Sequence, residues 1–191
     1  MPSQAPSSVT VEVIATPGDV GSHGGTDGPG FDFYEIRGET GDELWNDMLK
    51  HGRKTRGGVA LAWCRLRLSC RLQIAPHSTA VSIAAVDAIP KITITMPKWT
   101  GYENASSEMQ RRWKRFYDAV KSHEEWHKHD FQRAVAEVER VVSQLPAADS
   151  QQALIAAVDA ASREIGEKYD RRQNDFDAST DHRRYRNILF E

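Results

Sequence analysis

The sequence has few cysteines, no long apolar run and no excess of charge of either sign. Cys64 and Cys70 are the two cysteines among 191 residues. On one extended strand their Cα atoms would lie about 20 Å apart at roughly 3.3 Å per residue, which is beyond disulfide reach. We therefore expect two free thiols, buried as small apolar side chains, and a fold held by its core.

The lack of a long apolar run and of excess charge argues against a membrane and against nucleic acid as partners. No stretch approaches the roughly 18 apolar residues that a membrane-spanning helix needs, so no membrane span is expected. The formal net charge is -2, from 25 Lys and Arg against 27 Asp and Glu, which gives no electrostatic reason to expect nucleic acid as a partner.

Compartment and oligomeric state stay open. The first residues, MPSQAPSSVTVEVIATPGDVG, lack the basic start and apolar run of an ordinary signal peptide. We expect a cytoplasmic protein from the sequence as written, or a secreted one if a leader has been removed. Glycine is concentrated in residues 16–30, TPGDVGSHGGTDGPG, which predicts irregular structure. We expect residues 1–30 to form a short strand and a flexible glycine-rich segment, and residues 31–191 to form one domain.

Strand patterns come early in the chain and helix patterns late. Residues 60–74 alternate, and one face of that strand carries apolar side chains: Ala60, Ala62, Cys64, Leu66, Leu68, Cys70, Leu72 and Ile74. Thr40 and Glu43 form a capping box for a short helix that stops at Gly52. Residues 104–145 contain no Gly or Pro, and a second helix to about Phe176 follows. These patterns predict an α+β fold, with a small antiparallel sheet packed on a long antiparallel helical hairpin.

The motif HEEWH lies on the apolar stripe of the first long helix. The stripe is formed by Met109, Trp113, Phe116, Val120, His123, His127, Phe131, Ala134, Val138, Val141 and Leu145. Because His123 and His127 lie one turn apart, both can bind one zinc ion at about 2.0–2.1 Å. Glu124 is rotated by about 100° and can instead act on water as a general base, as in zincin metallopeptidases. His129 is expected to face solvent.

A catalytic zinc normally has three protein ligands, and the sequence offers two candidates for the third. If the hairpin turns near Ala147, residues 164–171 lie opposite the two histidines, which makes Glu164 one candidate. His182, beyond the second helix, is the other. Tyr169 and Tyr185 are weaker candidates for a hydrogen-bond donor to a reacting carbonyl.

Several segments together resemble a known family. They are FYEIRGETGDELWNDM, the strand around Trp63, ITITMPKW, HEEWH, and a C-terminal pattern that runs from Phe176-Asp177 through Thr180 to His182. Over about residues 31–183 the chain resembles the bacterial family catalogued as domain of unknown function nine-two-two, described as candidate zinc-dependent proteases. It departs in having His182-Arg183 where His-Gly is common, and Phe176 where Tyr is common. The resemblance implies a zincin-like fold with His182 as third ligand.

The function expected from these patterns is that of a zinc-dependent peptidase. His123, His127 and His182 would hold the zinc, Glu124 would be the general base, and the substrate would be a protein or peptide. The alternative is a zinc-stabilised structural or binding domain without catalysis, in which a fourth protein ligand closes the site. A metal-free helical hairpin that binds other proteins is a further alternative.

Overall fold

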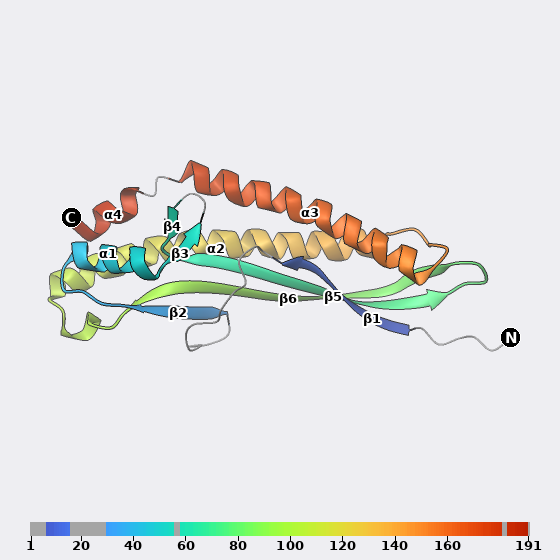
Figure 1. The fold of residues 1–191 in the computed structure, drawn as a ribbon, viewed down its shortest axis with the longest axis horizontal. Coiled ribbons are helices and arrows are strands. Elements are labelled where there is room, and N and C mark those ends of the chain that lie inside the picture. Colours follow the sequence, from blue (N-terminus) through green and yellow to red (C-terminus); the bar gives the residue numbers. More distant parts are fainter. Residues whose placement is uncertain (1–6, 16–29, 56–57, 181–182, 191) are drawn as a thin grey trace. The chain divides into compact units, whose positions relative to one another are not determined.

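The computed structural model describes residues 7–15, 30–55, 58–180 and 183–190 (Figure 1). The strands are β1 (Ser7–Ala15), β2 (Phe31–Ile36), β3 (Arg53–Thr55), β4 (Gly58–Ala60), β5 (Trp63–Pro76) and β6 (Val81–Trp99). The helices are α1 (Gly41–His51), α2 (Ser107–Ser143), α3 (Gln151–Ser179) and α4 (Arg183–Phe190), with a 3-10 turn at Tyr102–Asn104. The fold is α+β, and no helix within the described ranges is long and apolar enough to cross a membrane.

The chain forms two compact units. The first comprises residues 1–19, 66–91 and 129–175, and the second comprises residues 20–65, 92–128 and 176–191. The expected domain boundary after residue 30 stays a prediction, and residues 16–29 lie outside the described part of the chain.

The main sheet is mixed, whereas an antiparallel sheet was expected. Its strand order is β1-β5-β6-β2, and β1 pairs antiparallel with β5. β2 runs parallel to β6, from the pair Phe31 and Ile94 to the pair Ile36 and Trp99. The chain leaves β2 through α1 and three further strands before β6 begins, and a crossover of this length permits parallel pairing.

In the first unit, residues 129–143 of α2 pack antiparallel to α3. Arg172 lies against Asp130, and Lys168 against Glu137, so the expected helical hairpin is present in this unit. Its core contains the predicted face of β5 and the stripes of both helices: Leu66, Leu68, Cys70, Leu72, Ile74, Phe131, Ala134, Val138, Val142, Leu154, Val158, Ile165 and Tyr169. Val142 takes the core position that was expected for Val141.

The expected register of this hairpin was wrong. A turn near Ala147 would place Asp130 opposite residue 164, but Asp130 contacts Arg172 instead. The linker between the helices is engaged elsewhere, because Ala148 and Val81 exchange backbone hydrogen bonds of 2.8 and 2.9 Å. The linker therefore does not reverse the chain directly at the end of α2. As a result, each residue of α2 faces a residue of α3 that lies several positions later in the chain than a symmetric turn would give.

The second unit packs α1, α4 and the first part of α2 on β2 and the end of β6. Its core contains Ile36, Leu44, Met48, Ala62, Ile94, Met96, Trp99, Trp113, Phe116, Val120, Tyr185 and Leu189. The predicted capping box of α1 is present, with Glu43 donating to Thr40 Oγ1 at 3.3 Å and accepting from the Thr40 amide at 3.2 Å. No helix was expected at residues 183–190, yet α4 packs on α1 (Figure 1).

α4 is held closely at its C-terminal end. A Cβ atom on Gly41 would lie 2.5 Å from the Leu189 carbonyl oxygen, so only glycine permits this approach of α4 to α1. Arg112 on α2 donates to the Phe190 carbonyl at 3.1 Å. Tyr185, on the buried face of α4, is therefore fixed in the core of the second unit.

Candidate metal site

Three residues of HEEWH are buried, and for His123 and His127 their place on the α2 stripe predicts this. His123, Glu124 and His127 are 8%, 5% and 7% exposed, whereas His129 is exposed and bonds Gln132. The stripe continues through Trp113, Phe116 and Val120, so the histidines follow apolar residues on the same side of the helix. Imidazole nitrogens in such a position need polar partners.

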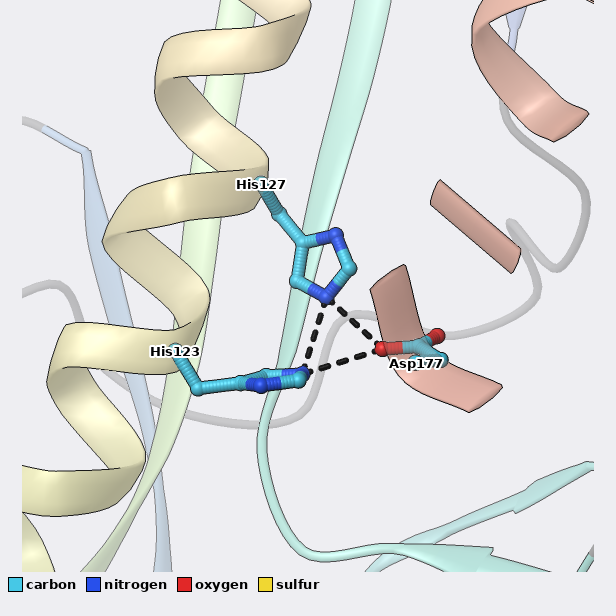
Figure 2. Close-up of side chains that lie close together, drawn as sticks. All are labelled: His123, His127 and Asp177. Atoms are coloured by element: carbon cyan, nitrogen blue, oxygen red, sulfur yellow. Dashed lines mark hydrogen bonds and ion pairs between the residues drawn. The ribbon is translucent and has the colours of Figure 1, made fainter. Parts of the chain in front are cut away.

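The partner shared by both imidazoles is Asp177, in the last turn of α3 (Figure 2). Its Oδ1 atom lies 3.0 Å from Nε2 of His123 and 3.0 Å from Nε2 of His127. The two Nε2 atoms also lie 3.0 Å from each other. Two nitrogens and one carboxylate oxygen thus form a nearly equilateral triangle, and all three residues belong to the second unit.

Asp177 is ionised in this setting. Burial by itself raises the pKa of its carboxyl, but hydrogen bonds from His123 and His127 and the charges of the two rings together lower that pKa well below its ordinary value. The side chain is nevertheless 48% exposed, so the triangle is accessible from the Asp177 side.

No arrangement of protons satisfies all three edges of the triangle. Ionised Asp177 brings no proton, and an N–H group that points to its oxygen does not point to the other nitrogen. At least one edge therefore brings together two lone pairs or two N–H groups, which repel. A metal cation removes this repulsion because it binds all three atoms through lone pairs. Donor atoms of a tetrahedral zinc with bonds of about 2.0–2.1 Å lie about 3.3 Å apart, close to the observed spacing.

Glu124 lies beside the triangle and outside it. Burial is the largest effect on its carboxyl, whose pKa is raised to about 7. The charge of His127 and a hydrogen bond from the Cys64 amide lower this pKa, whereas the charge of Asp177 raises it. A carboxyl with a pKa near 7 can accept and return a proton close to neutral pH.

Aromatic rings enclose the histidines. Phe176 stacks on His123 with ring centroids 4.8 Å apart, and on Trp126 with centroids 3.7 Å apart. Tyr185 presents an edge contact to His123 at 6.2 Å, so α4 also reaches the site. Tyr169, in the first unit, donates its hydroxyl to Glu137 at 3.0 Å.

The two candidates predicted for the third ligand, Glu164 and His182, have different outcomes. Glu164 is exposed on α3, in the first unit, and does not belong to the triangle formed by described residues. His182 lies outside the described residues, so its role stays a prediction.

Asp177 was not predicted as a ligand. Its place in the C-terminal pattern, directly after Phe176, was the available signal, but the resemblance implied the histidine of that pattern, His182, as the ligand. The wrong hairpin register also pointed to residues 164–171 instead of to the end of α3.

The comparisons with known proteins give a family and no function. A model for a family described as bacterial proteins of unknown function (DUF922) matches residues 31–183. No curated protein and no solved structure matches the chain.

Proposed function

We propose that this chain, which belongs to the DUF922 family of bacterial proteins, is a zinc-dependent peptidase with Glu124 as general base. The observation that carries the proposal is the convergence of His123, His127 and Asp177, whose three donor atoms lie 3.0 Å from one another. A buried carboxyl of raised pKa stands next to this group on the same helix.

The donor set fits zinc. Two imidazoles and one carboxylate are the protein ligands of a common class of catalytic zinc sites, which keep a fourth position open. Bound there, zinc supplies Lewis acidity toward a carbonyl oxygen and acidifies water. The same donor set also binds Fe(II) in oxygenases, but a buried glutamate one residue after the first histidine favours hydrolysis over oxygen chemistry.

Glu124 moves the protons in this mechanism. Its carboxylate accepts a proton from the attacking water and then returns it to the leaving amine, so one group serves both half-steps. The raised pKa of its carboxyl, about 7 in the metal-free site, suits both transfers near neutral pH. The Cys64 amide holds the carboxylate in place while it changes protonation state.

The finer expectations from the sequence form part of the same proposal. The helix α2, which carries HEEWH, is the active-site helix of a zincin-like architecture, and the substrate is a protein or peptide. Asp177 supplies the third donor. His182 was predicted for that place from the family resemblance, and the zinc affinity of His182→Ala decides whether it is also a ligand.

The test uses two neighbouring carboxyls on α2. Glu124 and Glu125 are both changed to Gln, and the zinc-loaded variants are incubated with a fluorogenic peptide mixture that carries every residue type around the cleaved bond. Glu125 is half-buried and lies 3.7 Å from Lys121, so it serves as the matched control. We expect Glu125→Gln to cleave like the parent and Glu124→Gln to be about 100-fold slower or more, with zinc retained in both.

Two outcomes contradict the peptidase. If Glu124→Gln cleaves as fast as the parent, Glu124 is not the base and the mechanism is wrong. If the zinc-loaded parent cleaves no peptide of the mixture, the chain is a zinc-stabilised domain without catalysis.

A further inference from the structure

One side chain contacts both histidines and is the neighbour of the third donor. The Phe176 ring stacks on His123 at an interplanar angle of 26° and meets the edge of His127, with centroids 5.3 Å apart. The next residue in the chain is Asp177, whose carboxylate bonds both rings. Phe176 is itself no ligand, because a phenyl ring offers no donor atom.

Asp177 stands where a helix is least stable by itself. α3 ends at Ser179, and the last turn of a helix frays because its carbonyls lack partners within the helix. Here the end is closed locally. The hydroxyls of Ser179 and Thr180 donate to the Phe176 carbonyl at 2.8 and 3.0 Å, and the Thr180 amide donates to the Asp177 carbonyl at 3.1 Å.

These hydrogen bonds lie within the last turn of α3 and do not attach it to α2. The ring of Phe176 makes that attachment, because it lies against Trp126 of α2 with ring centroids 3.7 Å apart and planes 12° apart. Nearly parallel rings at that distance make contact over most of a face, which restricts both sliding and rotation. Since residues 176 and 177 are adjacent, a fixed ring also holds the backbone from which the Asp177 side chain projects. The Asp177 carboxylate points at the two imidazoles in Figure 2.

We propose that Phe176 is the positioning residue of the metal site: its ring, held between the side chains of α2, keeps the last turn of α3 in place so that Asp177 meets His123 and His127. This inference rests on the proposed function, because it assumes that the three donors bind a metal. It goes further because it states that an aromatic contact, which does not itself bind metal, determines the position of the third ligand.

A flat ring at position 176 is therefore required, and its chemical identity matters less. Tyr keeps the ring and adds a hydroxyl at its far end, so Phe176→Tyr should bind zinc like the parent. Leu keeps an apolar side chain but loses the flat face, so Phe176→Leu should bind zinc about 10–100-fold more weakly, as loss of an outer partner of a metal ligand does. Trp126→Leu removes the same contact from the α2 side and should have a similar effect.

The experiment measures zinc affinity of the metal-free full chain by competition with a chromogenic chelator. Phe33→Leu is the matched control, since Phe33 is half-buried in the second unit and stacks only on Phe31 among the described ring contacts. Thermal unfolding of each metal-free variant is recorded alongside. We expect Phe33→Leu and Phe176→Tyr to keep the parent's affinity, whereas Phe176→Leu loses it.

A double-mutant cycle separates positioning from a general loss of structure. If Phe176 acts through Asp177, then Phe176→Leu should weaken zinc binding much less in an Asp177→Asn background than in the parent. Additive effects, or equal affinity of Phe176→Leu and parent, overturn the inference and leave the zinc site standing. A parent that binds no zinc overturns the proposed function, and this inference with it. If Phe176→Leu does not fold, the cycle is run with Trp126→Leu.

Discussion

The backbone amide of Cys64, in β5, donates a hydrogen bond to the carboxylate of Glu124, in α2. This contact joins the strand to the helix that carries His123 and His127, and it fixes a carboxylate that has only a small exposed fraction. It also places the Cys64 thiol in the field of Glu124. Burial, and after it the Glu124 charge, raises the pKa of that thiol to about 12.

Thiol labelling of the metal-free protein at pH 9 tests this relationship. The thiolate is the reactive form, so Cys64 and Cys70, whose pKa values are about 12 and about 11, should both react far more slowly than in urea. Glu124 is ionised at this pH. Glu124→Gln removes its charge, which lowers the pKa of Cys64 and should speed labelling of Cys64 while Cys70 is unchanged.

The labelled sites are identified by mass spectrometry of peptides, with Glu125→Gln as control. Unchanged labelling of Cys64 in Glu124→Gln would mean that the carboxylate does not face the thiol. Faster labelling of both cysteines would instead report a loosened fold.

Measuring the zinc affinity of single-residue variants identifies the third ligand. Asp177→Asn should lose more than the roughly 10–100-fold that loss of an outer partner causes, because a donor with a full negative charge becomes a neutral amide. Asp175→Asn, an exposed position two residues earlier on α3, and Glu164→Gln should leave the affinity unchanged.

His182→Ala belongs to the same series. If Asp177 completes the set of donors, this change leaves the affinity within a few-fold of the parent. A loss as large as that of Asp177→Asn would give the site four protein ligands, as in closed structural zinc sites. The proposal would then move to the zinc-stabilised domain.

In the first unit, the ion pair of buried Asp130 with exposed Arg172 should lose different amounts of folding free energy depending on which partner is replaced. Its side chain is 1% exposed and accepts from Nε and Nη2 of Arg172 at 3.1 and 2.7 Å and from Gln173 at 3.0 Å, whereas Arg172 is 42% exposed. Arg172→Leu leaves a buried charge without its main partner and should cost about 3 kcal/mol. Asp130→Asn leaves a guanidinium that water can solvate and should cost about 1 kcal/mol.

Urea unfolding of the metal-free variants measures both free energies. Equal losses, or a larger loss for Asp130→Asn, would contradict the burial of Asp130 and the exposure of Arg172 on which the asymmetry depends.

Local patterns in the sequence predicted those parts of the fold that depend on near neighbours. The capping box of Thr40 and Glu43, the alternation of β5 and the buried positions of His123 and His127 all follow from contacts within a few residues. The α+β class also followed from the order of the patterns.

Pairings between distant segments were not predictable in the same way. The exchange of hydrogen bonds between Val81 and Ala148 carries the linker away from a tight turn, and no periodicity in either segment encodes it. The hairpin register, and with it the place of Asp177, depends on that contact. The parallel pairing of β2 with β6 likewise depends on the crossover through α1, β3, β4 and β5.

The central claim is that His123, His127 and Asp177 bind one zinc ion, and the zinc content of the chain tests it most directly. The metal-free parent and His127→Ala are loaded with excess zinc and passed through a desalting column. The zinc content of each is then measured by elemental mass spectrometry and divided by the protein concentration. The account predicts one zinc per chain in the parent and essentially none in His127→Ala, since a single imidazole and one carboxylate hold zinc weakly. A parent without zinc, or a His127→Ala variant that retains a full equivalent, would contradict it.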